Sequence, residues 1–273
     1  MNENTRLERK ATEIRIAVLK MIHEAKAGHI GGSFSSIDIL TALYHNVLNI
    51  DPQNPTDDAR DRFILSKGHI AEALWAVLAD RGFIKKEELK TFCGFGTRLI
   101  AHPNNKVAGV EMNTGSLGQG LSVAVGMALA AKMDGKAYRT FTLMGDGEQA
   151  EGSVWEAAMS AAHYKLDNLV AIIDRNRLQI SGTTEDVMTL EPLPSKWTSF
   201  GWHVVEVDGH NMNQLIEALS TNRRGSGKPT LIMANTIKTK GIPAGENNPA
   251  WHHHVPSDAQ YKAALNELEA KLT

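Results

Sequence analysis

The sequence predicts an α/β protein built on a mainly parallel sheet with helices on both faces. Two observations support this prediction. Short apolar runs typical of buried strands alternate with amphipathic segments of helical period, and a glycine or a polar residue follows each run. Strands that alternate with helices in this way pair in parallel, and helices then cover both faces of their sheet.

Helical periodicity dominates the first half of the chain. Leu7, Ile14, Val18 and Ile22 share one face of a helix that Gly28 ends. We expect, in order, a helix over 7–26, a loop over 28–33, a helix over 37–47 with Ser36 as its N-cap, a strand over 62–65, a helix over 71–78 and a helix over 121–132.

The second half of the chain alternates more regularly. No linker interrupts the order of its segments, so residues 1–273 are expected to form a single domain. We expect strands over 140–144, 169–173, 202–207 and 230–234, and helices over 152–164, 192–200, 211–223 and 259–272.

Composition argues against several classes of function. A net charge of −2, with 42% hydrophobic and 22% charged residues, gives no field that attracts nucleic acid or a membrane surface. Cys93 is the single cysteine, the N-terminal segment lacks the apolar core of a signal peptide, and no apolar run approaches the roughly 20 residues that span a bilayer. We therefore expect a soluble cytoplasmic protein.

Polar side chains follow two of the predicted strands. Asp146 stands between two glycines after the run 140–144, and Asn176 comes shortly after the run 169–173. Ligands of open α/β sheets bind beyond the carboxyl ends of the strands, so these two side chains are expected side by side at that edge. Their carboxylate and amide oxygens suit a hard divalent cation that carries a phosphate ligand.

Four histidines, His29, His69, His102 and His252, lie near glycines or prolines at predicted element ends. A histidine at a strand-to-helix junction, such as His69, can meet an anion at the helix N-terminus. A purely structural role is also open for His29, because it fits a surface position after the C-cap of a helix. The three histidines at 252–254 are not expected to hold one ion, since neighbouring side chains of an extended chain point in opposite directions.

Several short motifs together resemble the transketolase family. Asn176 follows the aspartate of Gly145-Asp146-Gly147 by thirty positions, as in the thiamine diphosphate fingerprint. The other motifs occur in the family's order along nearly the whole chain. They are AGHIGG at 27–32, SKGH at 66–69, AHP at 101–103, TGSLGQG at 114–120 and ENNPAWH at 246–252.

This resemblance implies a role for each matching residue around thiamine diphosphate. It implies that the Asp146 and Asn176 side chains and the Leu178 carbonyl bind Mg²⁺ or Ca²⁺ together with the diphosphate. The remaining cofactor contacts that it implies are His69 and Gly147 at the diphosphate, Gly115 and Leu117 at the aminopyrimidine, and Ile180 at the thiazolium.

The resemblance also implies the substrate channel and an interface. His29, His102 and His252 would line the channel, bind sugar hydroxyls and move protons, a task that suits side chains titrating near neutrality. His253 stands where the family commonly has glycine, so it is kept as a second candidate for the place of His252. Glu151 and Glu156 resemble interface carboxylates, although they also fit as solvated acids at a helix start.

The implied reaction transfers a two-carbon ketol unit from a ketose to an aldose. The chain matches only the first, diphosphate-binding domain of a transketolase, so we expect the pyrimidine-binding and C-terminal domains on a partner polypeptide, in an α2β2 heterotetramer. The glutamate that activates the cofactor would lie on that partner, and this chain alone would be inactive.

Other functions remain open at this point. One is a ketol transferase for a branched or sulfonated ketose. Another is a subunit of a different two-subunit thiamine diphosphate enzyme, such as a 2-oxo acid dehydrogenase, which the histidine set disfavours because a 2-oxo acid does not need those donors. A third is a non-catalytic domain that only binds a metal or a partner.

Overall fold

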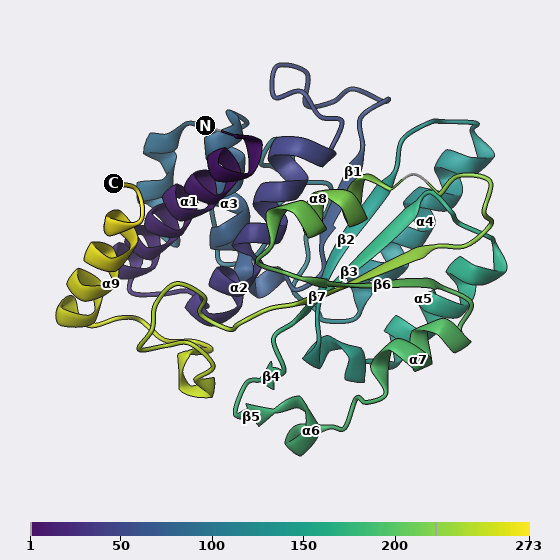
Figure 1. Ribbon diagram of the computed structural model, residues 1–273. Coiled ribbons are helices and arrows are strands. Elements are labelled where there is room, and N and C mark those ends of the chain that lie inside the picture. The colour runs from purple at the N-terminus through teal and green to yellow at the C-terminus, as the bar shows by residue number, and fades with distance from the viewer. Residues whose placement is uncertain (1, 222) are drawn as a thin grey trace.

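The computed structural model describes residues 2–221 and 223–273. Within this part of the chain, five strands form one parallel sheet in the order β1-β2-β3-β7-β6 (Figure 1). The parallel sheet confirms the predicted fold class. The strands are β1 (Arg62–Leu65), β2 (Thr140–Gly145), β3 (Leu169–Arg175), β6 (His203–Asp208) and β7 (Thr230–Asn235).

The predicted helices are present, with ends that differ by a few residues in most cases. The short helix α6 and an antiparallel ribbon of β4 (Leu178–Gln179) and β5 (Gly182–Thr183) were not expected, because such short elements leave no periodic pattern. The helices are α1 (Glu3–Ala25), α2 (Ile30–Ala42), α3 (Ala71–Arg81), α4 (Gln119–Met133), α5 (Gly152–His163), α6 (Thr184–Val187), α7 (Leu193–Ser199), α8 (Met212–Ser220) and α9 (Asp258–Ala270).

Alternate residues of the central strands enter two different cores. In β3, Val170 and Ile172 pack in a core with α1, α2, α3, α8 and α9, whereas Ala171 and Ile173 pack in a core with α4, α5 and α7. Because successive side chains of a strand point to opposite faces, both faces of the sheet are covered by helices. This confirms the predicted layering. No helix among the described residues has the length and apolar character needed to cross a membrane.

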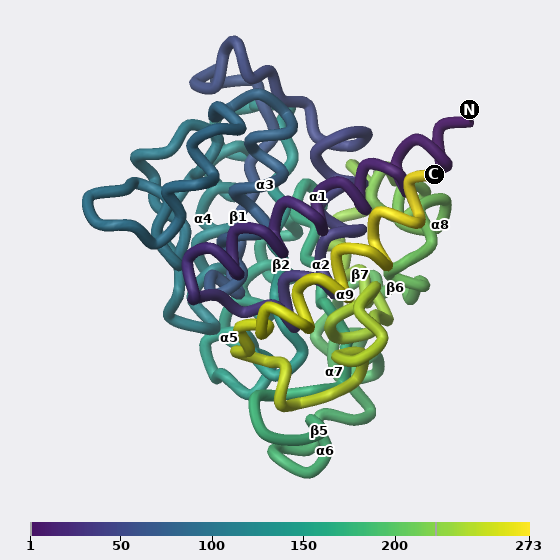
Figure 2. Tube along the Cα trace, turned by 90° about the vertical axis from the view of Figure 1, so that its left-hand side faces the viewer, coloured from purple at the N-terminus to yellow at the C-terminus, as the bar shows by residue number. Residues whose placement is uncertain are grey.

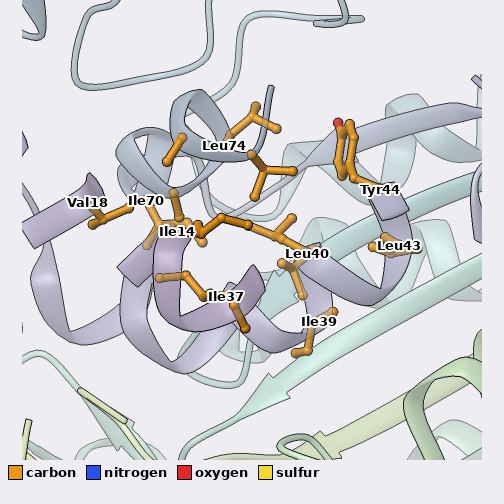
Figure 3. Close-up of a cluster of buried hydrophobic side chains, with 14 of the residues drawn as sticks. Ile14, Val18, Ile37, Ile39, Leu40, Leu43, Tyr44, Ile70 and Leu74 are labelled. Carbon is orange, nitrogen blue, oxygen red and sulfur yellow. The ribbon is translucent and has the colours of Figure 1, made fainter. Parts of the chain in front are cut away.

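Helix α2 lies at the centre of the larger core. Each of its residues is buried, and Ile37 and Leu40 meet Ile14 and Val18 of α1 and Leu74 of α3 (Figure 3). Fully burying one such aliphatic side chain contributes about 1.5–3 kcal/mol. The core around α2 therefore holds the start of this helix firmly in place.

Helix α9 closes the far side of this core. It runs beside α1, so that the last helix of the chain covers the first (Figure 2). Ala264 and Leu268 of α9 are buried against the core, and the Arg9 guanidinium of α1 donates a hydrogen bond to the Leu272 carbonyl at 3.1 Å. The amphipathic pattern that predicted this helix reflects that contact.

The prediction for residues 28–47 was partly wrong. Helix α2 begins at Ile30, with His29 as its N-cap residue, so Gly31 and Gly32 lie in its first turn rather than in a loop. A Cβ atom added to Gly31 would lie 2.7 Å from the Trp251 carbonyl oxygen, so this glycine serves close packing rather than a turn. Ser36 does not cap a helix, because it lies inside α2.

Gly31→Ala should destabilise the fold, because the added methyl group would overlap the Trp251 backbone. We expect a loss of about 1–3 kcal/mol in the free energy of unfolding, measured by denaturant titration. Gly126→Ala is the matched control, since Gly126 lies in α4 with open space around its Cα. That variant should gain about 0.5–1 kcal/mol, and equal effects at both positions would contradict the packing argument.

Candidate functional site

A cavity of about 230 Å³ opens at the carboxyl ends of the strands. Its walls come from the segments that follow β1, β2, β3 and β7, from the start of α2, from the loop before α4 and from the segment that carries His252. This is the edge at which the strand-end residues were predicted to meet. It is lined by His29, Gly32, Lys67, His69, Gly115, Leu117, Gly145, Asp146, Gly147, Glu148, Asn176, Leu178, Gln179, Ile180, Lys238 and His252.

Asp146 and Asn176 both line this cavity, as predicted from their places after β2 and β3. The Asp146 carboxylate is 2% exposed and accepts hydrogen bonds from the Gly147 and Arg177 amides at 2.8 and 2.5 Å. The Asn176 amide oxygen accepts from the Leu178 amide at 3.1 Å. These bonds hold two oxygen-bearing side chains at the wall of one cavity.

The surroundings of Asp146 fit a bound cation. Burial and the nearby negative charge of Asp174 raise the pKa of Asp146, while the Arg175 guanidinium and the Arg177 and Gly147 amides lower it. A cation beside the carboxylate would relieve this penalty on its charged form. Within the described residues no group of three His, Cys, Asp or Glu side chains forms a metal site. One carboxylate, one amide and one carbonyl make an oxygen set that suits Mg²⁺ or Ca²⁺.

Two buried lysines in the cavity wall were missed at the sequence level. The Lys67 ammonium donates to the Asp174 carboxylate at 2.5 Å, and the Lys238 ammonium lies 3.0 Å from His252 Nδ1 and 3.4 Å from the Leu178 carbonyl. Burial and the charge of Lys67 lower the pKa of Lys238 to about 8. A signal for both existed, because Lys67 and Lys238 come two and three residues after the ends of β1 and β7, at the same edge as Asn176.

Three of the four predicted histidines form one cluster. The ring centroids of His29, His69 and His252 lie 5.1–5.6 Å apart, and His253 packs on His29 at 4.5 Å. Burial is the main cause that lowers the pKa of His29 to about 4 and that of His252 to about 3. Burial, followed by the charge of Lys67, also holds the pKa of His69 well below its usual value. At neutral pH these imidazoles are uncharged.

The expectation about the run 252–254 rested on an extended chain, and this premise was wrong. His252 has helical backbone angles, φ −60° and ψ −54°, directly after a 3₁₀ turn over Pro249–Trp251. Its ring and that of His253 therefore both reach His29, instead of pointing in opposite directions. The ring of His254 instead packs at a tilt on Trp251, with ring centroids 4.4 Å apart, and contacts the Gln260 side chain.

The other predicted residues are distributed around and outside the cavity. Gly115, Leu117, Gly147 and Ile180 line it. His102 is not in its lining but lies against Gly115, where an added Cβ would be 2.7 Å from the His102 ring. Ile180 is 64% exposed and has a φ of +48°, an unusual angle for a β-branched residue. Glu151 and Glu156, predicted at an interface, are exposed at the first turns of α5, outside the cavity.

Comparison with known families identifies the class of protein. The family model described as "Transketolase, thiamine diphosphate binding domain" matches residues 7–268. The fold and the cavity are thus those of a thiamine diphosphate-binding α/β protein. The chain belongs to the transketolase family and corresponds to its thiamine diphosphate-binding domain, which confirms the resemblance in the sequence motifs.

Relatives of two lengths match the chain. It is 49% identical to an apulose-4-phosphate transketolase subunit of Phocaeicola vulgatus, over 97% of this chain and 95% of the relative. It is 46% identical to a 6-deoxy-6-sulfo-D-fructose transketolase subunit of Clostridium sp., over 96% of each. The crystal structure of Campylobacter jejuni transketolase superposes with a TM-score of 0.91 at 31% identity, and the chain covers 98% of itself but only 43% of that protein.

His29 should make stability depend on pH. The unfolded state binds a proton at the usual pKa of 6.5, whereas the folded state binds it only near 4. The free energy of unfolding contributed by His29 is therefore complete above pH 6.5 and is lost as the pH falls towards 4.

We expect His29→Gln to lose less stability than the wild type between pH 6.5 and 4, measured by denaturant titration at several pH values. Glu72, whose pKa burial raises to about 7, acts in the opposite direction but is present in both proteins and cancels in the difference. Parallel curves for the two proteins would contradict this assignment.

Proposed function

We propose that this chain is the thiamine diphosphate-binding subunit of a two-subunit transketolase. The observation that carries the proposal is the convergence of Asp146, Asn176 and Leu178 with the neutral His29, His69 and His252 around one cavity. The oxygen donors suit a divalent cation with its diphosphate, and the imidazoles suit a polyhydroxylated substrate. A cofactor and a substrate that bind together in this cavity would use both groups of residues.

The residues present fit the cofactor. The Asp146 carboxylate, the Asn176 amide oxygen and the Leu178 carbonyl would hold Mg²⁺ or Ca²⁺, and His69 and the Gly147 amide would contact the diphosphate. Gly115, Leu117 and Ile180 would contact the aminopyrimidine and thiazolium rings, and the exposed side chain of Ile180 is free to do so. Thiamine diphosphate, when bound, supplies the electron sink for breaking and forming carbon–carbon bonds.

The histidines would bind and orient the sugar. An uncharged imidazole donates a hydrogen bond from one ring nitrogen and accepts one at the other, which matches a sugar hydroxyl. Because burial keeps His29 and His252 neutral, each would hydrogen-bond to a substrate hydroxyl, whereas pKa values of about 4 and 3 lie below the near-neutral range expected for residues that move protons. His102 lies against Gly115, which lines the cavity, and would reach the substrate beside that residue.

A partner polypeptide would complete the site. The chain spans 39% of the length of human transketolase, to which it is 40% identical, and the names of two relatives of similar length describe each as one subunit of a transketolase. We infer that the pyrimidine-binding and C-terminal domains reside on a second chain in an α2β2 heterotetramer in the cytoplasm. Glu151 and Glu156, exposed on α5, would lie at an interface of this assembly.

The names of the relatives differ in the donor sugar. Their names include apulose-4-phosphate and 6-deoxy-6-sulfo-D-fructose, so an unusual ketose is a second candidate beside the ordinary ketose phosphates. We favour a ketose over a 2-oxo acid as the donor class, because three imidazoles at one cavity offer several partners for hydroxyl groups.

Asp146→Ala should weaken cofactor binding. Removal of the carboxylate leaves the cation without its only charged protein ligand in the proposed set, and we expect a loss of at least the roughly 10–100-fold that outer-shell changes already cause. Calorimetric titration of thiamine diphosphate with Mg²⁺ into the assembled complex measures it. Asp58→Ala, at an exposed loop position, makes the same change in charge and should leave the affinity unchanged. Unaltered affinity in Asp146→Ala would refute the metal assignment.

The assembled protein, but not this chain alone, should transfer ketol units. The expected test is coexpression with a candidate C-terminal subunit, followed by assays on a panel of donors. The panel should hold xylulose-5-phosphate, fructose-6-phosphate, apulose-4-phosphate, 6-deoxy-6-sulfo-D-fructose and a 2-oxo acid as the control. A chain that is fully active without a partner would contradict the proposed division into two subunits. Activity on the 2-oxo acid but on none of the sugars would contradict ketol transfer and indicate a different thiamine diphosphate reaction.

A further inference from the structure

Glu72 is a buried carboxyl group that neither the sequence motifs nor the cavity lining includes. It lies in the first turn of α3 and is 0% exposed. One carboxylate oxygen, Oε1, accepts a hydrogen bond from the His29 amide at 2.6 Å and another from the Ser33 hydroxyl at 2.9 Å. Glu72 therefore joins α3 to the beginning of α2 at the residue that carries a cluster imidazole.

The Glu72 carboxylate accepts its hydrogen bond at the N-terminus of α2, where a capping side chain would otherwise act. His29 is the N-cap residue of α2, and the structure records no capping hydrogen bond from its own side chain. The carboxylate of Glu72 supplies negative charge there from a neighbouring helix, where the helix dipole favours it. The imidazole of His29 is thus left for the cavity, while a residue of another element holds its backbone.

The chain in front of His29 is shaped to allow this contact. Gly28 has a φ of +140°, and a Cβ atom at that position would lie 3.2 Å from Glu72 Oε1 and 2.7 Å from the Ile22 side chain. A larger residue would push the backbone away from the carboxylate. The glycine of the motif is therefore needed for the approach of the His29 amide to Glu72.

The second oxygen of Glu72 is unusual. Within the part of the chain that the structure describes, Oε2 is buried and has no hydrogen-bond partner. Burial raises the pKa of Glu72 to about 7, against the opposing hydrogen bonds from its own amide, the His29 amide and Ser33. A buried carboxyl group with an unpaired oxygen is costly, and such a group points to a role other than stability.

His29 is the residue at which a fixed backbone matters most. Its ring contacts His69, His252 and His253 with centroid distances of 4.5–5.6 Å, so it is the centre of the cluster. A shift of about 1 Å in a substrate-binding group can reduce the rate about 100-fold. Anchoring the His29 amide therefore fixes the central imidazole against its three neighbours.

We propose that Glu72 is a positioning residue for His29: its carboxylate anchors the His29 amide at the start of α2 and so aligns the imidazole for the substrate. The consequence for activity rests on the proposed function, whereas the anchoring itself does not. Glu72 acts through the backbone of His29 and does not touch the substrate. The effect of removing it should therefore disappear once the His29 imidazole is absent.

The first test measures the anchor without cofactor, substrate or partner. Amide exchange of the full chain, labelled with ¹⁵N-histidine, is followed by NMR at pH 8, and the His29 signal is identified by its absence in His29→Gln. In Glu72→Ala we expect its exchange to accelerate at least about 10-fold beyond any change in global stability, since a lost hydrogen bond is worth about 1.4 kcal/mol or more at a charged acceptor. Glu72→Gln, which retains an acceptor oxygen, should restore most of the protection.

Asp61→Ala is the matched control. Asp61 is also a buried carboxylate that accepts two backbone amides, those of Asn49 and Arg139 at 3.0 and 2.7 Å, but it precedes β1 at the opposite edge of the sheet. It should lower global stability without a selective effect on the His29 amide. Unchanged exchange at His29 in Glu72→Ala, or equal acceleration in Asp61→Ala, would overturn the anchor.

The second test uses the complex with its partner subunit at pH 8. We expect Glu72→Ala to reduce kcat/KM for ketol transfer roughly 10–100-fold, and Glu72→Gln to recover most of it. In the His29→Gln background the further loss from Glu72→Ala should be less than about twofold, because both changes remove the same alignment. Independent, multiplicative losses would refute the route through His29. A wild-type complex without ketol transfer would refute the proposed function instead and would leave the exchange result standing.

Discussion

The buried carboxylate of Asp174 is the contact on which the rest of the site depends. It is fully buried at the end of β3 and accepts a hydrogen bond from the Lys67 ammonium at 2.5 Å. It also accepts hydrogen bonds from neighbouring elements. A buried ion pair is favourable only when such bonds satisfy its remaining oxygens. Here they come from α2, from the segment after β3 and from the segment after β7, and thereby tie these parts to one point. The donors are Ser35, Ser36, Asn176 and Thr236.

This arrangement also determines the electrostatics of the cavity. The Asn176 side-chain amide donates a hydrogen bond to the Asp174 carboxylate at 3.2 Å. Its oxygen therefore faces away from Asp174 and accepts a hydrogen bond from the Leu178 amide. Lys67 is paired with Asp174, burial lowers the pKa of Lys238 to about 8, and burial keeps the His29 and His252 imidazoles neutral. The site therefore combines oxygen atoms that can bind a cation with uncharged hydrogen-bonding rings. A phosphate-bearing cofactor and a polyhydroxylated substrate need these two kinds of group.

Much of the site was predictable from the strand-end rule and from the resemblance, and the exceptions have physical causes. Asp146 and Asn176 follow buried strands, and their meeting at one edge required only parallel pairing. Lys67 and Lys238 follow strands too, but a lysine is usually a solvated surface residue. The burial of Lys67 depends on Asp174, distant in sequence, and that of Lys238 on contacts with the Leu178 carbonyl and His252. Glu72 is the one charged residue of the apolar run 71–79, but its partner could not be predicted, because it meets His29 only after α2 and α3 have packed.

The sequence by itself determined the alternation of strands and helices, the class of fold and the family, because these depend on local periodicity and on short motifs. Only the tertiary structure decided that β7 lies between β3 and β6, that α2 begins at Ile30 and that His252 and His253 both reach His29. Each of these depends on packing between segments far apart in the chain, such as the approach of Trp251 to Gly31. Local sequence fixes which elements form, and contacts across the sheet fix how their ends meet.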